Sequence, residues 1–526
     1  MKRILFSAAA LLGLAQGLSS CKKDFLDENP QSLYTPQTTL VDSLGFEAGM
    51  TGLQAVVRDM YTTTEPQGLL GVMQVGTDAV SPAMPQGVEV PYYNYEKLQS
   101  QDGGAAFYWT AAYRIINNAN ILIQAAANAP SSLRQGYKNR ITAEARFYRA
   151  YAYNFLTTLY GAVPLVLEPI ATPRTDFTRA PVAEVNTAII NDLTTAIPNL
   201  FLANKAASGR ITQGAARQLL AEVYLRTNQA NLAEQQCQAI LTSNQYKLIT
   251  ARFGVRASAP GDYYSDMFII GNQRRNQGNT EIIWGIEQQL NVPGGQNGNG
   301  GQQRRMWVPG YYNITGMLIA DSLGGRGIGR MRLSQWVDYR LYAAADMRNS
   351  KYNLKRKFYY NDPSKPALYG KRVIVTGSDT SVRITPYITK WNMYNPVDEF
   401  GLATVKDLPM MRLGETYLLL AEAQLKQGNT AGAATSINVL RTRAQAAQVT
   451  AANIDLNFIL DERARELIGE ENRRITLVRT GTLIDRVTRL NGSSITGLRP
   501  ENLLLPIPQS EIDRNVGGGL TQNPGY

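Results

Sequence analysis

Residues 142–160 read TAEARFYRAYAYNFLTTLY, and this stretch predicts a long amphipathic helix. Its large apolar side chains recur every four residues and so fall on one helix face: Phe147, Tyr151, Phe155 and Leu159. Gly161 follows as a C-cap and Pro164 as a stop signal. Residues 109–123 show the same pattern, so the two segments predict an antiparallel helical hairpin in a largely helical N-terminal third.

A second helical pair occurs twice in the chain. Residues 219–222 and 419–422 both read LLAE, and the match continues into a following helix. Each copy predicts a helix, a short polar turn and a second helix, similar to a tetratricopeptide hairpin. In the first copy we expect Asn231 to cap the second helix, with Glu234 completing a capping box. Because the copies lie far apart in the sequence, long insertions must separate the helical pairs.

Histidine is absent and cysteine is rare, which excludes several classes of enzyme. Without histidine there is no Ser-His-Asp or Cys-His catalytic arrangement and no imidazole ligand for a metal. The chain also lacks G-x-S-x-G, Walker A and G-x-G-x-x-G motifs. Cys237 falls opposite Ile437 of the repeat, so we expect a buried structural thiol. The sequence therefore shows no familiar catalytic, cofactor-binding or metal-binding signature, and whether an ion binds in the loop region stays open.

The N-terminus has the pattern of a bacterial lipoprotein signal. A basic pair precedes an apolar run over residues 4–18, and two serines lead into Cys21. The run is too short for a membrane-spanning helix, which needs about 20 residues. We expect residues 1–20 to be removed and Cys21 to carry the lipid that anchors the chain to a membrane. The alternative is an ordinary secretory signal with an incidental cysteine.

The positive charge of the chain is spread along its length. The net charge is +11, or +9 once the two basic residues of the signal are removed. A nucleic-acid-binding protein would concentrate this charge on one element. Here the basic clusters are short: Arg274-Arg275, Arg304-Arg305, Lys355-Arg356-Lys357 and Arg473-Arg474. We therefore expect a solvated basic surface and no nucleic-acid partner.

The middle of the chain, from about residue 246 to 391, is rich in Gly, Asn, Gln and aromatic residues. Residues 281–286 and 372–375 predict short strands. Between them, residues 294–301 read GGQNGNGG, a loop too polar to belong to a core. Binding residues concentrate on loops that a rigid frame supports, so we expect a binding site in this region.

Five segments, in order along the chain, resemble the SusD/RagB family of outer-membrane lipoproteins from Bacteroidetes-type bacteria. They are Cys21–Asp27, the helix and turn Ala143–Leu165, the helical pair Arg412–Arg441, Leu505–Ile512 and the ending Gln522–Tyr526. One departure falls at Glu471–Thr476, where the family usually has a Gly-His-Arg-aromatic-aromatic-Asp run. The missing aromatic and aspartate leave the packing of the local helix open.

The resemblance implies a mostly α fold, in which tetratricopeptide-like helical hairpins support an irregular, loop-rich region with short strands. It divides the chain into a signal peptide (1–20), an N-terminal helical part (21–245) and a C-terminal part (246–526). The C-terminal part would hold a loop-rich insertion over about 246–391 and a helical pair over about 411–445.

The resemblance also implies a role. It is that of a non-catalytic, nutrient-binding lipoprotein on the outer membrane, facing the cell surface. Such a protein lies as a lid over a TonB-dependent, SusC-like transporter. It captures oligosaccharides or, in some members of the family, peptides.

Binding a sugar requires flat aromatic platforms for its C–H faces and planar hydrogen-bonding groups around them. The candidates lie outside the periodic helices. They are Tyr92, Tyr93 and Tyr95 in one loop, Trp307, Tyr311 and Tyr312 in another, Trp336 downstream, and the polar residues Gln303, Arg304, Arg305 and Asn313. We expect the two loops to form one ligand platform. The alternative for each aromatic residue is ordinary packing in the core.

Two other functions stay open at the level of the sequence. A surface glycoside hydrolase would hold two carboxylates about 5 to 10 Å apart, which a sequence with 42 acidic residues neither reveals nor excludes. A helical-repeat adaptor would bind only protein. The ligand class is also open among neutral glycans, acidic glycans and peptides, since a fold does not fix a function.

Overall fold

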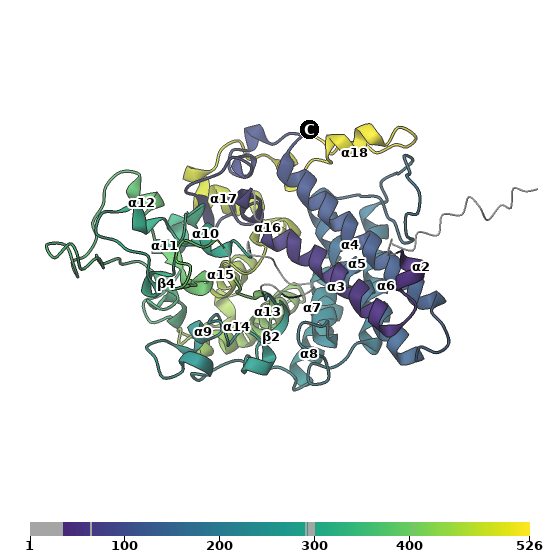
Figure 1. The fold of residues 1–526 in the computed structure, drawn as a ribbon, viewed down its shortest axis with the longest axis horizontal. Coiled ribbons are helices and arrows are strands. Elements are labelled where there is room, and N and C mark those ends of the chain that lie inside the picture. The colour runs from purple at the N-terminus through teal and green to yellow at the C-terminus, as the bar shows by residue number, and fades with distance from the viewer. Residues whose placement is uncertain (1–34, 64–65, 290–291, 293–299, 403) are drawn as a thin grey trace, which may run out of the picture.

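The computed structural model describes residues 35–63, 66–289, 292, 300–402 and 404–526 (Figure 1). The predicted lipidation site Cys21 and residues 293–299 of the glycine-rich loop lie outside these residues. Long helices build one side of the molecule, and loops with short helices and strands build the other (Figure 1). Within the described part, no helix combines the length and the apolar character needed to cross a membrane.

Four long helices form the N-terminal part. They are α3 (Ser43–Thr62), α4 (Gly103–Asn128), α5 (Gln135–Tyr160) and α6 (Val182–Ala196), preceded by the single turn α2 (Pro36–Thr39). Asp42 and Asp102 cap α3 and α4 by accepting hydrogen bonds from backbone N–H groups of the first turn. α5 ends at Gly161, whose φ of +75° favours glycine. Because α5 packs against α4, the predicted hairpin is confirmed.

The internal repeat folds as two helical hairpins in the same register. The first consists of α7 (Gln213–Arg226) and α8 (Ala230–Thr242), and the second of α13 (Leu413–Lys426) and α14 (Thr430–Arg443). α13 packs against α8, and Glu234 accepts hydrogen bonds from Gln424 and Gln427 across this contact. The predicted cap at Asn231 is wrong, because α8 begins one residue before it and Glu234 is engaged by the other hairpin. Cys237 is buried on α8, as the repeat predicts.

The C-terminal part combines helices with short antiparallel strand pairs, one of which includes a strand, β1, from the N-terminal part. The helices are α9 (Tyr263–Asp266), α10 (Gln303–Trp307), α11 (Gln335–Tyr339), α12 (Asp379–Val382), α15 (Leu456–Leu467), α16 (Arg473–Arg479), α17 (Leu483–Asn491) and α18 (Gln509–Arg514). The strands pair as β1 (Val80–Pro82) with β3 (Met331–Leu333), β2 (Ile282–Ile286) with β6 (Leu408–Arg412), and β4 (Leu354–Lys355) with β5 (Tyr387–Ile388). Single turns of 3-10 helix fill many of the connections.

One of the two predicted strands is present. The strand predicted at 281–286 is confirmed as β2, which pairs with β6. The strand predicted at 372–375 is wrong, because Arg372 forms only an isolated bridge with Tyr359. Val373 is buried and Ile374 is 79% exposed, so the segment alternates as a strand would, but its pairing does not extend beyond the bridge.

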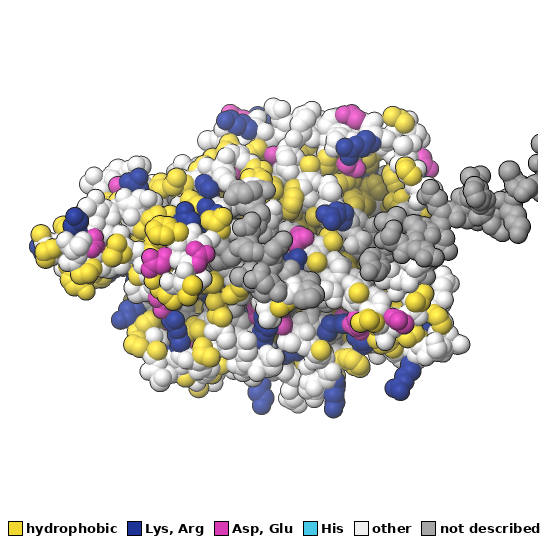
Figure 2. Space-filling model, in the orientation of Figure 1, with side chains coloured by type: hydrophobic (Ala, Val, Ile, Leu, Met, Phe, Trp, Pro, Cys, Tyr) yellow, Lys and Arg dark blue, Asp and Glu magenta, His cyan; other side chains and the backbone are white. Residues whose placement is uncertain are grey.

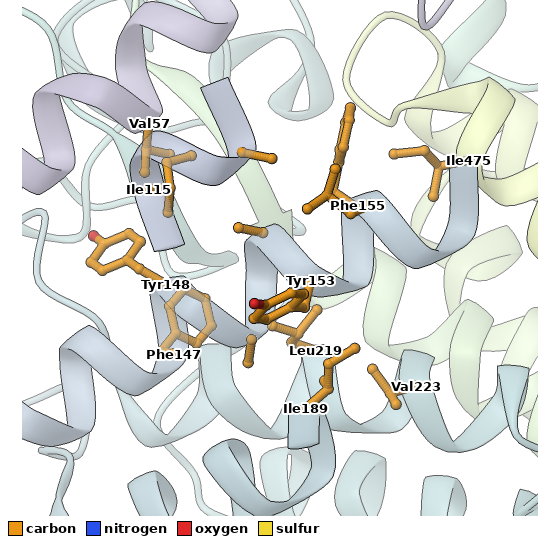
Figure 3. Close-up of a cluster of buried hydrophobic side chains, with 14 of the residues drawn as sticks. Val57, Ile115, Phe147, Tyr148, Tyr153, Phe155, Ile189, Leu219, Val223 and Ile475 are labelled. Carbon is orange, nitrogen blue, oxygen red and sulfur yellow. The ribbon is translucent and has the colours of Figure 1, made fainter. Parts of the chain in front are cut away.

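The largest hydrophobic core joins residues from both halves of the chain (Figure 3). Phe147 of α5 lies in a cluster that also contains Ile115 of α4, Leu219 of α7 and Ile475 of α16. Trp284 of β2 packs edge-on against Phe147, with ring centroids 5.2 Å apart. The predicted N-terminal and C-terminal parts therefore share this core.

Two of the basic clusters lie inside the protein. Arg304, Arg305, Arg473 and Arg474 are each more than nine-tenths buried. The expectation of a solvated surface is wrong for these residues, because acceptors from distant segments replace water. Arg304 donates to the backbone carbonyls of Met393 and Gly401. The basic side chains visible in Figure 2 are scattered over the surface rather than gathered in one patch.

Candidate functional site

A cavity between the N-terminal helices and the C-terminal part is the candidate site, and we call it the aromatic cavity. Aromatic side chains from five segments line it: Tyr61, Tyr108, Tyr151, Trp307 and Trp391. Amide and carboxyl side chains line it as well: Gln74, Asn154, Gln218, Glu222, Gln303, Glu415, Glu470, Glu471 and Asn472. A concave site with apolar walls and a few convergent polar groups is the usual form of a small-ligand site.

Trp307 and Gln303 reach the aromatic cavity from α10, one turn apart. Gln303 donates from Nε2 to the backbone carbonyl of Tyr61 at the end of α3. The Tyr61 hydroxyl shares a hydrogen bond with the hydroxyl of Tyr151 and accepts one from Asn472 Nδ2 at 3.2 Å. Burial raises the pKa of both tyrosines, so both stay neutral phenols at physiological pH.

The carboxylates of the aromatic cavity differ in how they are neutralised. Glu415 accepts from Arg463 at 2.7 Å and from Gln218 at 2.8 Å. Burial raises the pKa of Glu415, and the Arg463 guanidinium opposes that rise. Glu222 accepts a hydrogen bond from Asn154 Nδ2 at 3.2 Å, and no cation of the described residues forms an ion pair with it. Glu222 is therefore the carboxylate of the aromatic cavity that the fold leaves most available to a ligand.

The structure buries several of the predicted binding aromatics. Tyr92 and Tyr311 have no exposed surface. The Tyr92 hydroxyl donates to Asp102, and the Arg474 guanidinium lies 5.2 Å from the Tyr92 ring centre. The Tyr311 hydroxyl donates to the carbonyl of Gly325 at 2.9 Å. Both rings pack as core, because the 3-10 turns that carry them direct these side chains inward.

The remaining predicted residues are not brought together on one platform. Trp336 is 6% exposed and lies under the guanidinium of Arg486 at 5.2 Å. Arg305 is 8% exposed and donates to Gln302. Tyr93 and Tyr312 are half-buried. Three hydrophobic clusters separate the set, with Tyr92 in the largest, Trp307 and Trp336 in a second, and Tyr311 in a third. Of the predicted binding aromatics, Trp307 lines the aromatic cavity.

Sequence reasoning missed most of the lining of the aromatic cavity. Tyr151 belongs to the helical face assigned to the core, and Tyr61 and Trp391 come from segments with no binding pattern. Glu222 is the last residue of the repeated LLAE motif, and this repetition could have identified it as a candidate. Among the residues that the structure describes, no three His, Cys, Asp or Glu side chains gather as a metal site requires.

The chain matches two family models and several curated proteins. The SusD family model matches residues 268–526, and a model described as "Starch-binding associating with outer membrane" matches residues 24–225. The chain is 24% identical to SusD-like protein P25 of Formosa agariphila, over 94% of each chain. It is also 24% identical to the starch-binding protein SusD of Bacteroides thetaiotaomicron, over 99% of this chain and 98% of that protein.

Solved structures show the same fold. The chain is similar to a laminarin-binding SusD-like protein, with a TM-score of 0.71 at 22% identity over 92% of this chain and 100% of the other. It is similar to surface glycan-binding protein A from Bacteroides thetaiotaomicron, with a TM-score of 0.72 at 19% identity over 93% of this chain and 100% of that one. These likenesses confirm the mostly α fold. The two family models and the curated relatives confirm the resemblance drawn from the sequence. The chain belongs to the SusD family.

Proposed function

We propose that this protein binds oligosaccharides at the cell surface and passes them unchanged to a TonB-dependent, SusC-like transporter in the outer membrane. A lipid on Cys21 anchors it there. Relatives named for binding starch, laminarin and surface glycans support this proposal. The description of the family model that matches residues 24–225 supports the association with the outer membrane.

The observation that carries the proposal is the composition of the aromatic cavity. Trp307 and Trp391 supply flat apolar faces of the kind that pack against sugar C–H groups. Glu222 and Gln303 supply acceptors and donors for hydroxyl groups around those faces. Tyr93 and Tyr312, which are half-buried, stay proposed contacts outside the cavity.

The buried members of the predicted set take a different role in this proposal. We assign Tyr92, Tyr311, Trp336 and Arg305 to packing, because each is at most 8% exposed and none of them lines the aromatic cavity. Trp307 is equally buried from solvent but does line that cavity.

A pair of tryptophan variants tests the site. Trp307 and Trp336 belong to the same hydrophobic cluster, but only Trp307 lines the aromatic cavity. Trp307→Ala and Trp336→Ala should therefore lose comparable stability, about 3 to 5 kcal/mol each. In calorimetric titrations of folded protein with oligosaccharides, Trp307→Ala should abolish saturable binding and Trp336→Ala should retain it. Equal affinity of both variants would place the ligand elsewhere.

The partner and the absence of catalysis need separate measurements. The lipidated chain should co-purify from membranes with a large β-barrel protein, and Cys21→Ser should reduce that recovery because the chain is no longer held at the membrane. Incubation of pure protein with the bound oligosaccharide should release no reducing ends. Release of reducing ends that tracks the purified protein would favour a glycoside hydrolase instead.

A further inference from the structure

Lys406 is a buried cation that no carboxylate neutralises. Its side chain is 3% exposed and lies two residues before β6. Its ammonium group donates to the backbone carbonyl of Asn392 at 2.9 Å. The adjacent Asp407 is taken by Arg274, with hydrogen bonds of 2.6 and 3.0 Å. Among the described residues no Asp or Glu oxygen lies within 4 Å of the Lys406 ammonium, so its charge lacks a direct partner.

Lys406 lines a pocket that shares no residue with the aromatic cavity, and we call it the Lys406 pocket. α9 and the segment around Asn392 form its sides, and the rings of Phe268, Tyr352 and Tyr394 line it. An ion pair between Arg256 and Asp321, 3.1 Å long and about half exposed, lies at its solvent side. The pocket therefore has an aromatic lining, a basic group near its mouth and a buried ammonium.

Asp266 adds a second unsatisfied group to the Lys406 pocket. It has no exposed surface, and its Oδ2 accepts from Arg252 Nε at 2.6 Å and from the backbone of Phe253 at 3.2 Å. Its Oδ1 is buried and accepts no hydrogen bond from the described residues. A ligand with an anionic oxygen for Lys406 and an O–H or N–H donor for Asp266 would satisfy both groups, and an acidic sugar carries both.

The charged residues that the structure describes around Lys406 do not supply it with a negative partner. Asp321 forms an ion pair with Arg256, and Asp266 forms one with Arg252. The charge of Lys406 is therefore the one in this set of described residues that has no ion-pair partner. Burial and, to a smaller extent, the nearby Arg256 lower the pKa of Lys406 to about 7, and Asp321 opposes them. An ammonium in this position gains most from an anion, because a charge-assisted hydrogen bond is strong where water is excluded.

We propose that the Lys406 pocket is a subsite for the anionic group of an acidic saccharide, either a carboxylate or a sulfate ester. The Lys406 ammonium donates to an oxygen of that group, Arg256 attracts it at the mouth, and Asp266 accepts from a sugar hydroxyl. This inference rests on the proposed function and narrows its ligand class to acidic glycans. It gives the buried lysine a counter-charge that the protein itself does not supply.

The test compares probes that differ only in charge. The purified mature chain lacking Cys21 is titrated with oligogalacturonate, with the same oligomer after reduction of its carboxyl groups, and with a sulfated galactan oligosaccharide. Lys406→Met keeps most of the length of the side chain and removes the charge. It should weaken binding of the preferred anionic probe roughly tenfold or more and leave binding of the reduced oligomer unchanged. Preference for oligogalacturonate identifies the group as a carboxylate, and preference for the galactan identifies a sulfate.

A matched variant controls for net charge. Lys426→Met removes one positive charge from an exposed position at the end of α13, and it should leave every affinity unchanged. Both variants should unfold at temperatures close to that of the parent. In Lys406→Met a buried lysine is replaced by an apolar side chain of similar shape, and in Lys426→Met the changed side chain is exposed. A loss with Lys426→Met equal to that with Lys406→Met would indicate only long-range electrostatics and would overturn the subsite.

The failures of the two proposals can be told apart. If neutral oligosaccharides bind, Trp307→Ala abolishes that binding, and the anionic probes bind no tighter, the acidic subsite is overturned and the proposed function stands. If no saccharide of either charge binds, the proposed function is overturned as well. Lys406-dependent binding of an acidic peptide in that case would assign the pocket to a different class of ligand and contradict the inference.

Discussion

Arg473 and Asp78 form a bidentate ion pair across 395 positions of the sequence, with hydrogen bonds of 2.8 and 2.7 Å. Both residues are buried, and Arg486 donates to the same carboxylate at 2.7 Å. This pair ties α16 and α17 to the segment that precedes β1. The neighbouring Arg474 donates to backbone carbonyls and lies over Tyr92. Arg473 falls at the arginine of the family pattern, and Arg474 falls where that pattern has an aromatic residue.

The Asp78 contact should be one of the most sensitive points for stability. Asp78→Asn removes the carboxylate that two buried guanidinium groups share and leaves Arg473 paired with Glu471 and Arg486 paired with Asp461. We therefore expect a loss of about 3 kcal/mol in the free energy of unfolding. Urea denaturation measures it. Asp176→Asn is the control, because Asp176 pairs with Arg174 in solvent and its loss should leave the unfolding midpoint almost unchanged. Equal midpoints for the two variants would show that the buried pair does not hold the two segments together.

Replacing the glutamate of the LLAE motif by glutamine should change stability much more in one copy of the repeat than in the other. Glu422 is 1% exposed and receives two hydrogen bonds of 2.7 Å from Arg479, whereas Glu222 receives one from Asn154. Glu422→Gln should lower the unfolding free energy by about 3 kcal/mol or more, because it strands a buried arginine. Glu222→Gln should change stability by less than about 1 kcal/mol and weaken oligosaccharide binding. If Glu222→Gln is the more damaging to stability, the assignment of the two carboxylates is wrong.

Acid should destabilise the protein through Glu466. Burial alone would raise the pKa of this carboxyl, but Arg443, Arg412 and Arg348 outweigh it and hold the pKa far below its ordinary value of 4.5. The stabilisation is therefore complete above pH 4.5 and is lost as the pH falls below it, because the unfolded chain then binds a proton that the folded chain does not.

Denaturation at several pH values measures the Glu466 contribution. Glu466→Gln should be less stable than the parent at pH 7 by about 3 to 5 kcal/mol. Below pH 4.5 the parent should lose about 1.4 kcal/mol per pH unit more than the variant, so the two should converge. Asp485→Asn, which breaks an exposed pair with Arg489, should follow the parent at every pH. Parallel curves for the parent and Glu466→Gln would contradict the account.

Much of the helical fold could be predicted because its signals are local. The spacing of Phe147, Tyr151 and Phe155, followed by Gly161, defines the face and the end of α5 without any knowledge of the rest of the chain. The repeat fixed the register of two hairpins and the burial of Cys237 in the same way. Periodicity and caps act over a few residues, and so a sequence shows them directly.

The interior arginines and the candidate site could not be predicted, because their partners lie far away in the sequence. Nothing around Arg473 indicates that Asp78 will remove it from water. The loop aromatics were expected to be accessible, but 3-10 turns bury Tyr92 and Tyr311 in separate clusters. Trp307 reaches the aromatic cavity only because α10 packs against segments from both halves of the chain. Such convergence depends on tertiary structure, which no local pattern encodes.

Calorimetric titration of the parent protein, lacking Cys21, with a panel of neutral oligosaccharides, acidic oligosaccharides and peptides tests the central claim most directly. The account predicts saturable binding of one saccharide class with a stoichiometry near one, and no binding of peptides. Saturable binding of a peptide, together with no detectable binding of any saccharide, would contradict it.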